Sequence, residues 1–547
     1  MSGHEQSRSG VQCEHSKKID ALFSAYDRTG SPGLNLAVIS HGKIIHQRGY
    51  GVADLEHDTP FNSATQLRLG STTKHMCASC IFLLENRNLL SLEDDIHKFV
   101  PELPDFSSRI TIRHLLTMTS GFRDGLNMLL FSGQDSNDEI TRNTIMQILF
   151  RDTRLMFKPG DNCTYSNTNY ALLSTIIERI TKCSLADFMQ RNLFMPLGMK
   201  HSELIPMQST HLTLLASGYL PEEDGKSSKA HTLLELSGDG GVVSNLDDMV
   251  RWFKNYRNDQ LFGPDYRARI EAANPLNNGQ TCEYRHGMYV ASFLGETKIS
   301  HAGGLPGYLS DFAYFPESDL GIILLTNVFD VSLLEATDKI ALTIIAGSRD
   351  IARRRTQTNN YSLSPLGIFA SQEAALVLHF VQEKRHLVCY LLGERHQLTQ
   401  KTEHTYISSK PDYAIEITFD TTTPDQITLA LGNMRATVLY RIDEPGNMPA
   451  SCSDEYSGKY FSPATQATHE INVCEAMLTV TLTSSDKELV WKNFNHVIGD
   501  LFTSEIEGEP SNTNVQIKFT RDKEYSITGL SYSLSRCLAV EFIKMIE

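Results

Sequence analysis

The sequence predicts an α+β domain followed by two small antiparallel β-barrels. Strand-like segments lie at both ends of residues 1–350 with helical segments between them, a polar linker follows at Ser348–Ser364, and strand-like alternation prevails beyond it. Strands at both ends of a domain with helices between them indicate one antiparallel sheet covered by helices. We therefore expect a first domain over 1–350, a barrel over 360–447 and a second barrel over 453–547.

The elements of the first domain follow from its hydrophobic periodicity. Apolar residues at helical spacing over 19–26 predict an opening helix, which Gly30 ends. The same period predicts helices at Thr72–Leu90, Asn169–Thr181 and Val331–Gly347. Period-two alternation predicts strands at Leu34–Ser40, Lys43–Arg48, Gly287–Phe293, Lys298–Ala302, Ser310–Phe315 and Gly321–Thr326.

Alternation without helical period marks the rest of the chain. Strands are predicted there at Ala374–Val381, Leu387–Leu392, Ala414–Phe419, Gln426–Leu431, Ala476–Thr483, Leu489–Lys492, Val515–Thr520 and Leu538–Ile543, with a break at Pro445–Ser453. Two successive all-β units of this size fit two small antiparallel barrels.

Composition restricts the class of protein. With 41% hydrophobic and 21% charged residues the chain is globular, and a net charge of −15 argues against a nucleic-acid partner. No stretch approaches the length of a membrane span, and the start of the chain has no apolar signal segment. The ten cysteines lack the spacing of a disulfide scaffold. These features favour a cytoplasmic protein without a membrane partner.

The motif Ser71-Thr72-Thr73-Lys74 is the first candidate for chemistry. S-x-x-K also occurs at Ser40–Lys43 and Ser484–Lys487, but those copies lie in or beside strand turns. Ser71 instead opens a helix, which places Lys74 one turn away on the same face. Its hydroxyl and backbone N–H then lie at the positive end of that helix, where developing negative charge is stabilised.

Two further motifs contribute polar groups. In Tyr165-Ser166-Asn167 the phenol and the amide point the same way in extended chain, so a phenol that relays protons and an amide that binds substrate can face one cleft. His301 ends a predicted strand, and Gly303 and Gly304 after it allow the backbone to approach a ligand closely.

In this order the three motifs resemble those of the β-lactamase and penicillin-binding serine enzymes, class C-like branch. The flanking segments strengthen the resemblance: Gly49-Tyr50-Gly51-Val52-Ala53-Asp54, His114-Leu115-Leu116-Thr117-Met118-Thr119-Ser120-Gly121, Phe157-Lys158-Pro159-Gly160, Pro196-Leu197-Gly198-Met199 and Gly240-Gly241-Val242-Val243-Ser244. The resemblance covers about residues 15–345 and implies a β-lactamase/transpeptidase-like fold with a helical subdomain.

The third motif and the barrels indicate the branch. Family members often have Lys-Thr-Gly where this chain has His-Ala-Gly, and a neutral histidine holds a substrate carboxylate less firmly. A catalytic domain with two barrels resembles the bacterial D-aminopeptidases, in which a loop of the last barrel brings an acid to the substrate's amine. The equivalent loop here is expected at Thr483–Leu489, with Asp486 or Glu488 as the acid.

The resemblance implies a serine hydrolase that works through an acyl-enzyme. Ser71 is the expected nucleophile, Lys74 or Tyr165 the base, and the backbone N–H groups of Ser71 and Gly304 the oxyanion hole. Asn167, His301, Gly303, Gly304 and Asp486 are the expected substrate-binding residues. No metal or organic cofactor is implied.

A D-aminopeptidase-like peptidase acting on a small peptide, amide or ester is the leading hypothesis. A DD-carboxypeptidase, an esterase, a weak β-lactamase and a non-catalytic penicillin-binding-like sensor stay open as alternatives. The oligomeric state is open too, with a homodimer as one possibility.

Overall fold

The computed structural model of the 547-residue chain describes residues 14–133, 139–205, 212–222, 225–231, 234–258, 261–348, 366–383, 386–392, 394–408, 415–419, 422–431, 436–442, 454–474, 477–484, 487–504, 515–534 and 536–545. The first domain is built on an antiparallel sheet in the order β10-β11-β12-β13-β1-β2. Its strands are β1 (Leu34–Ser40), β2 (Lys43–Tyr50), β10 (Tyr289–Phe293), β11 (Glu296–Leu305), β12 (Tyr308–Phe315) and β13 (Leu320–Thr326). The first strand of this sheet in chain order, β1, is hydrogen-bonded to its last strand in chain order, β13.

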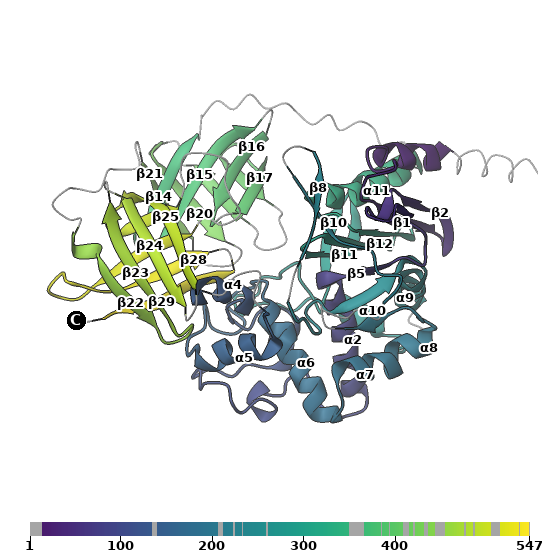
Figure 1. Ribbon diagram of the computed structural model, residues 1–547, viewed down its shortest axis with the longest axis horizontal. Helices are drawn as coiled ribbons and strands as arrows, with labels where there is room; N and C mark the ends of the chain where they lie inside the picture. The colour runs from purple at the N-terminus through teal and green to yellow at the C-terminus, as the bar shows by residue number, and fades with distance from the viewer. Residues whose placement is uncertain are drawn as a thin grey trace, which may run out of the picture.

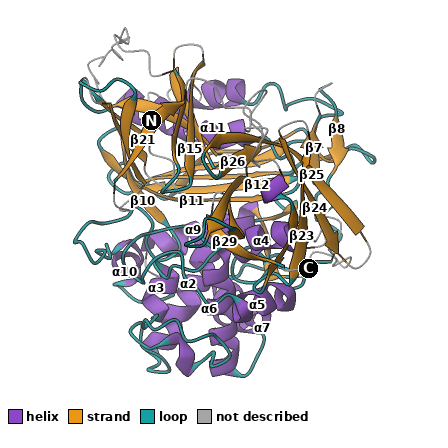
Figure 2. Ribbon diagram, turned by 90° about the vertical axis from the view of Figure 1, so that its left-hand side faces the viewer, coloured by secondary structure: helices purple, strands orange, loops and turns teal. Residues whose placement is uncertain are grey.

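Helices cover both faces of this sheet, and alternate residues of its strands face the two layers. One face packs against residues 14–22, which are helical, and against α11 (Leu334–Ser348). The other face packs against α2 (Thr73–Asn86) and α9 (Leu246–Asn258), and α6 (Asn167–Thr181) packs on α2. Figure 2 shows most of the helices gathered below the sheet. Along β1, Val38 faces the first layer and Ile39 the second.

Shorter elements complete the first domain. The remaining helices are α3 (Ile112–Leu116), α4 (Gly125–Leu129), α5 (Arg142–Arg151), α7 (Leu185–Met189), α8 (Met195–Leu197) and α10 (Tyr266–Glu271). Short strands are β3 (Val52–Asp54), β4 (Thr59–Pro60), β5 (Gln66–Arg68), β6 (Glu203–Leu204), β7 (Tyr219–Pro221), β8 (Ser227–Lys229) and β9 (Val242–Asn245). Single helical turns occur at η1 (Gly70–Thr72), η2 (Ile96–Lys98), η3 (Leu130–Ser132), η4 (Gln190–Phe194) and η5 (Val331–Leu333).

Two closed antiparallel barrels follow. The first comprises β14 (Gly367–Ser371), β15 (Leu376–Glu383), β16 (His386–Leu391), β17 (Glu394–Gln400), β18 (Thr405–Ser408), β19 (Ile415–Phe419), β20 (Gln426–Leu431) and β21 (Thr437–Ile442). The second begins with η7 (Asp454–Tyr456) and comprises β22 (Gly458–Ser462), β23 (Ala467–Cys474), β24 (Met477–Ser484), β25 (Lys487–Ile498), β26 (Leu501–Ser504), β27 (Gln516–Arg521), β28 (Ile527–Leu534) and β29 (Cys537–Lys544). The predicted fold class is confirmed.

The second barrel and the first domain share a hydrophobic core. Residues of α4, η3 and α5, among them Met128, Phe131 and Ile148, pack in one cluster with the interior of this barrel. Figure 1 shows α4 next to β28, between the barrel and the other helices. The imidazole of His469 on β23 bonds to the carbonyl oxygen of Phe131 at 3.0 Å. The domain boundaries predicted from the sequence stay a prediction, and the core of this barrel continues into α4, η3 and α5.

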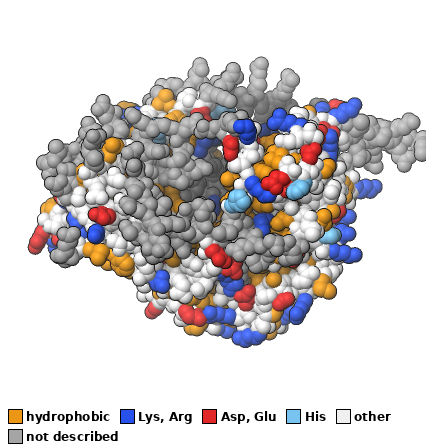
Figure 3. Space-filling model, viewed as in Figure 1, with side chains coloured by type: hydrophobic (Ala, Val, Ile, Leu, Met, Phe, Trp, Pro, Cys, Tyr) orange, Lys and Arg blue, Asp and Glu red, His pale blue; other side chains and the backbone are white. Residues whose placement is uncertain are grey.

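Within the described ranges, no helix is long and apolar enough to cross a membrane. On the described part of the face in Figure 3, acidic and basic side chains are interspersed, so that part offers no continuous basic strip.

Candidate active site

Ser71 lies in the turn η1, which leads directly into α2. Its side chain is part-exposed, whereas the residues that follow it in the first turns of α2 are buried. The hydroxyl of Thr72 donates to the carbonyl oxygen of His301 at 3.0 Å, and that of Ser310 donates to the carbonyl oxygen of Leu69 at 2.6 Å. These bonds fix the Ser71 turn against β11 and β12, so the hydroxyl is presented by a rigid part of the fold.

The ammonium of Lys74 is fully buried beneath Ser71. It donates to the hydroxyl of Ser71 at 3.1 Å, to the side-chain oxygen of Asn167 at 2.8 Å and to the carbonyl oxygen of Asp239 at 2.6 Å. Burial disfavours the charged form and lowers the pKa of Lys74 to about 7, although the nearby carboxylates of Asp239 and Asp124 act in the opposite direction. A lysine with this pKa is substantially neutral near pH 7 and can accept the proton of Ser71.

Strand β11 lies so close to the turn that carries Ser71 that only glycine fits at position 303. A Cβ on Gly303 would lie 1.9 Å from the carbonyl oxygen of Leu69 and 2.9 Å from the backbone nitrogen of Ser71. Gly70 has a positive φ of 52°, and a Cβ there would lie 2.9 Å from the nitrogen of Gly304. The backbone nitrogens of Ser71 and Gly304 are thereby brought to the same end of the turn, the arrangement that an oxyanion hole requires.

Tyr165, in the loop before α6, and Asn167, the first residue of α6, reach Lys74. The Lys74 ammonium lies 4.8 Å from the centroid of the Tyr165 ring and bonds to the Asn167 side chain. Asn167 also donates from its backbone and its side-chain nitrogen to one carboxylate oxygen of Asp124, at 2.7 and 2.9 Å. The structure therefore brings together Ser71, Lys74, Tyr165 and Asn167.

His301 lies in a buried aromatic cluster at the same end of the sheet. Its side chain is 2% exposed, and its ring lies 6.1 Å from that of Tyr165 and 5.8 Å from that of Tyr284. Burial holds the pKa of His301 well below its usual range, and the charge of Lys74 acts in the same direction. The imidazole is therefore neutral and cannot supply the cation that a Lys-Thr-Gly motif would supply.

The turn between β28 and β29 of the second barrel brings Arg536 to this group. The guanidinium carbon of Arg536 lies 4.5 Å from the centroid of the Tyr165 ring. The backbone carbonyl of Arg536 accepts a hydrogen bond from the backbone of Asp124 at 3.2 Å. The charge of Arg536 contributes to lowering the pKa of both Lys74 and His301. Arg536 thus belongs to the site electrostatically as well as by position.

Arg123 holds this turn in place. Its guanidinium donates to the carbonyl oxygens of Leu538 and Ala539, at 2.8 and 3.1 Å, and pairs with the carboxylate of Asp152 at 3.0 Å. Arg123 is 6% exposed, so the pair is largely removed from water. A buried cation that bonds to backbone carbonyls fixes the barrel relative to the first domain.

The predicted overhanging hairpin 483–489 joins β24 to β25 through backbone pairing of Thr483 with Glu488. Asp486 lies outside the described residues, as does the Glu488 side chain, so their contact with substrate stays a prediction. Sequence analysis missed Asp124, Asp239, Arg123 and Arg536. For Asp124 a signal existed, because it lies three residues after the family-like segment that ends at Gly121; an arginine in a barrel turn carries no such signal.

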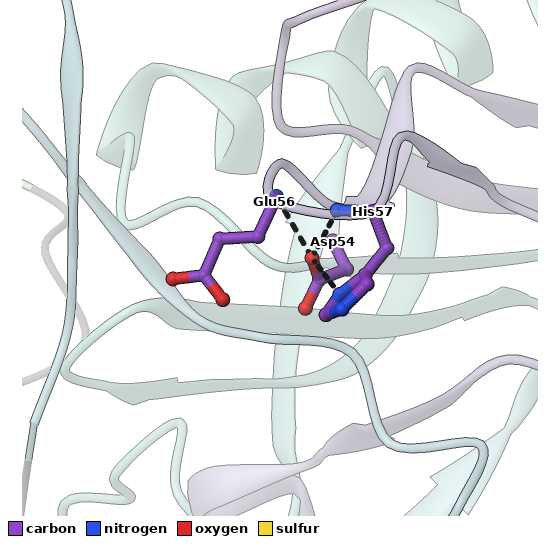
Figure 4. A group of neighbouring side chains, drawn as sticks. All are labelled: Asp54, Glu56 and His57. Atoms are coloured by element: carbon purple, nitrogen blue, oxygen red, sulfur yellow. Dashed lines mark hydrogen bonds and ion pairs between the residues drawn. The ribbon is translucent and has the colours of Figure 1, made fainter.

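The described part of the chain contains a group with the composition of a metal site. Donor atoms of Asp54, Glu56 and His57 lie within 4.8 Å of one another (Figure 4). However, one oxygen of Asp54 accepts the backbone N–H groups of Glu56 and His57, at 2.8 and 2.9 Å, and bonds to the His57 ring at 3.0 Å. These bonds are those of an ordinary aspartate-stabilised turn, and we assign no metal to it.

Comparison with known proteins agrees with this geometry. Over 346 residues the chain is 29% identical to penicillin-binding protein 4* of Bacillus subtilis, and the alignment covers 59% of this chain and 75% of that protein. It is 25% identical over 333 residues to a D-aminopeptidase of Gluconobacter oxydans, covering 60% of this chain and 62% of the relative.

Solved structures show the same fold. The D-amino acid amidase of Ochrobactrum anthropi matches with a TM-score of 0.53 and 21% identity, over 61% of this chain and all of that one. An octameric penicillin-binding protein homologue from Pyrococcus abyssi matches with a TM-score of 0.53 and 20% identity, over 80% of this chain and all of that one. The β-lactamase family model matches residues 19–344, more than half of the chain. The chain therefore belongs to the β-lactamase family, a family of serine hydrolases, and is similar to its members named penicillin-binding protein and D-aminopeptidase.

Proposed function

We propose that this protein hydrolyses a small peptide, amide or ester through an acyl-enzyme on Ser71. The observation that carries the proposal is the 3.1 Å hydrogen bond between the Lys74 ammonium and the Ser71 hydroxyl, together with a Lys74 pKa that burial lowers to about 7. A buried lysine that exchanges its proton near pH 7 next to a part-exposed serine is arranged for nucleophilic catalysis rather than for stability.

In the proposed mechanism, neutral Lys74 takes the Ser71 proton as the oxygen attacks the substrate carbonyl. The developing oxyanion accepts hydrogen bonds from the backbone N–H groups of Ser71 and Gly304. Tyr165, which lies against the Lys74 ammonium, passes its proton to the leaving group and takes the proton that Lys74 received from Ser71, so that Lys74 is neutral again. Water then hydrolyses the ester, with Lys74 again as the base.

The test is acylation of Ser71. The protein is treated with a neutral fluorophosphonate, and the adduct is located by peptide mass spectrometry. We expect a single adduct on Ser71 and none in Ser71→Ala. Ser40→Ala is the matched control, because Ser40 has the same S-x-x-K spacing but lies at the end of β1. An unlabelled wild-type protein, as expected of a penicillin-binding-like sensor with an inert site, would refute the proposal.

The finer proposal is a D-aminopeptidase-like peptidase that releases N-terminal D-residues. The two barrels after the catalytic domain and the relatives named D-aminopeptidase support it. The rival activities are those of a DD-carboxypeptidase, an esterase or a weak β-lactamase. The relative named as a penicillin-binding protein supports these activities. The proposed cytoplasmic location and a homodimeric state stay predictions.

Acetylation of the substrate separates these activities. D-alanyl and L-alanyl anilides are compared with and without an N-acetyl group. A D-aminopeptidase should lose most of its kcat/KM on the acetylated D-substrate and should act poorly on both L-substrates. Equal turnover of the free and acetylated D-anilides would exclude recognition of the amine and leave a carboxypeptidase or esterase.

A further inference from the structure

Two cysteines lie next to Tyr165, one on each of two neighbouring loops. Cys163 is two residues before Tyr165, and Cys282 is two residues before Tyr284. The rings of Tyr165 and Tyr284 are in edge-to-face contact, with their centroids 5.8 Å apart. The side chain of Cys163 hydrogen-bonds to that of Cys282, and both cysteines are partly exposed. The two thiols are therefore in contact with each other and within reach of solvent.

Hydrogen bonds hold the two loops side by side. The backbone N–H of Asn277 donates to the carbonyl oxygen of Gly160 at 2.9 Å. The side-chain nitrogen of Asn277 donates to the carbonyl oxygen of Pro159 at 3.0 Å and to the carboxylate of Asp161 at 2.7 Å. The two cysteines thus lie on loops that are fixed to each other, so their contact is part of the fold.

The surroundings of Cys282 favour its thiolate, which is the form that reacts with oxidants. The hydrogen bond from Cys163 lowers the pKa of Cys282, and the charge of Arg285 acts in the same direction, while burial and Glu283 oppose both. Nε and Nη1 of Arg285 are buried and have no hydrogen-bond partner among the described residues. This guanidinium is therefore available to stabilise a thiolate.

Other cysteines in the described ranges have different surroundings. Burial raises the pKa of Cys77 to about 12 and also raises that of Cys537, so both stay protonated and shielded from oxidants. Cys183 is partly exposed, but its thiol donates to the hydroxyl of Thr181 at 3.3 Å. Cys183 is therefore a control for an accessible thiol that bonds to a hydroxyl rather than to a second thiol.

We propose that Cys163 and Cys282 form a reversible disulfide when the protein meets a peroxide, and that this bond lowers turnover at Ser71. The thiolate of Cys282 attacks one oxygen of hydrogen peroxide; an S–O bond forms, the O–O bond breaks, and the departing hydroxide combines with the proton that Cys282 released. The sulfur of Cys163 then attacks the sulfenic acid; the S–S bond forms, the S–O bond breaks, and the second hydroxide leaves with the Cys163 proton as water. Two thiols are oxidised, and one peroxide is reduced to two waters.

The disulfide acts on catalysis through the position of Tyr165. Two sulfurs in hydrogen-bonding contact must approach further to form a covalent bond, which draws the segment before Tyr165 towards the Cys282 loop. In the thiol form the Lys74 ammonium lies 4.8 Å from the centroid of the Tyr165 ring. A displacement of about 1 Å can cost about 100-fold in rate. The effect on turnover rests on the proposed acyl-enzyme function, whereas formation of the disulfide does not.

The first test maps the disulfide in the full chain after treatment with hydrogen peroxide, removal of the excess by catalase and alkylation of the remaining thiols. Trypsin releases Cys163 and Cys282 on separate peptides, which end at Arg179 and Arg285. We expect non-reducing mass spectrometry to find these peptides joined, and dithiothreitol to separate them. In Cys163→Ser we expect a sulfenic acid on Cys282, which dimedone traps. A wild-type protein without the joined peptide would overturn the proposal.

The second test measures hydrolysis of the D-alanyl anilide before and after oxidation. Peroxide should lower kcat of the wild-type protein by about 10- to 100-fold, and dithiothreitol should restore it. The matched control Cys183→Ser should respond as the wild-type protein does. Cys282→Ser should have the kcat of the reduced wild-type protein and lose the reversible response; Cys282→Ala takes its place if the serine variant does not fold.

Two results of the second test would contradict control by this pair. One is an unchanged kcat in wild-type protein that mapping shows to be cross-linked. The other is a loss that dithiothreitol reverses and that persists in the Cys282 variants, because another residue would then be responsible. Failure of the proposed function looks different: the reduced protein hydrolyses no anilide and Ser71 is not labelled by the phosphonate, while mapping still decides whether the disulfide forms.

Discussion

The backbone N–H of Asp124 donates to the carbonyl oxygen of Arg536 at 3.2 Å, while the carboxylate of Asp124 accepts both nitrogens of Asn167. Asn167 in turn accepts from Lys74, which donates to Ser71. A continuous series of hydrogen bonds therefore runs from a turn of the second barrel to the nucleophile. A substitution at Asp124 should affect both the position of this turn and the hydrogen bonds of Ser71.

Asp124→Ala should lower the free energy of unfolding and the turnover number together. The carboxylate caps α4 and holds Asn167, so its loss should cost about 1 to 3 kcal/mol. Urea unfolding and kcat measure the two effects. Thr141→Ala is the control, because Thr141 caps α5 in the same way but lies outside the site. It should lower stability without changing kcat, and a normal kcat in Asp124→Ala would contradict the role of this residue.

The rate of Ser71 acylation should rise with pH through about 7. Below this value Lys74 is protonated and cannot act as a base; above it the amine is neutral, so the ascending limb follows the Lys74 pKa that burial lowers. The charges of Asp239 and Asp124 raise this pKa, and that of Arg536 lowers it. Arg536→Met should therefore shift the ascending limb to higher pH. Stopped-flow measurements of the acylation rate against pH give the midpoint of the ascending limb. A lower midpoint in Arg536→Met would contradict the predicted effect of the Arg536 charge on the Lys74 pKa.

Gly303→Ala should abolish most of the activity, whereas Gly304→Ala should be tolerated. A Cβ on Gly303 would lie 1.9 Å from a backbone oxygen, and the backbone cannot move away without displacing Ser71. A Cβ on Gly304 would meet the ends of Leu309 and Phe329 at 3.3 Å, and flexible side chains can adjust to it. We expect a loss of at least about 100-fold in kcat/KM for Gly303→Ala, the effect of removing an oxyanion-hole donor.

Cleavage of the chain at the linker 348–364 should leave the two fragments associated. Arg123 and the shared core of α4 and the second barrel hold them together. Limited proteolysis followed by gel filtration should therefore give one peak that contains both fragments. Arg123→Met leaves Asp152 unpaired and largely buried, which should cost about 3 to 5 kcal/mol and allow the nicked fragments to separate. Separation of the wild-type fragments would show that the contacts of Arg123 and the shared core do not hold the second barrel on the first domain.

The parts of this protein that the sequence predicts well are those in which local pattern and neighbouring motifs agree. The helix that begins after Ser71, the strands around His301 and the strand Leu34–Ser40 lie where period and turn residues place them. Ser71, Lys74, Tyr165 and Asn167 are also brought together as expected, because each lies at a junction that the fold family keeps close.

Contacts between distant segments could not be predicted in this way. Half of the strands in each barrel escape detection. In β17 (Glu394–Gln400) the residues are nearly all polar, so the segment lacks an apolar alternation. The position of Arg536 depends on how the second barrel packs on α4. Such packing between distant segments does not change the hydrophobic periodicity of either one. The sequence predicts a neutral His301, but the burial among tyrosines that lowers its pKa further depends on contacts that its motif does not show.

The docked turn also sets the order in which the enzyme can mature during synthesis. Arg123 and its partner Leu538 are 415 residues apart, so a ribosome needs roughly 20 to 80 s to make the second after the first. Throughout that time a nascent first domain has its nucleophile but lacks the turn that covers Tyr165, and the apolar side of α4 has no barrel against it. We expect such nascent chains to bind chaperones through α4 and to place Arg536 beside Tyr165 last, once β28 and β29 have paired.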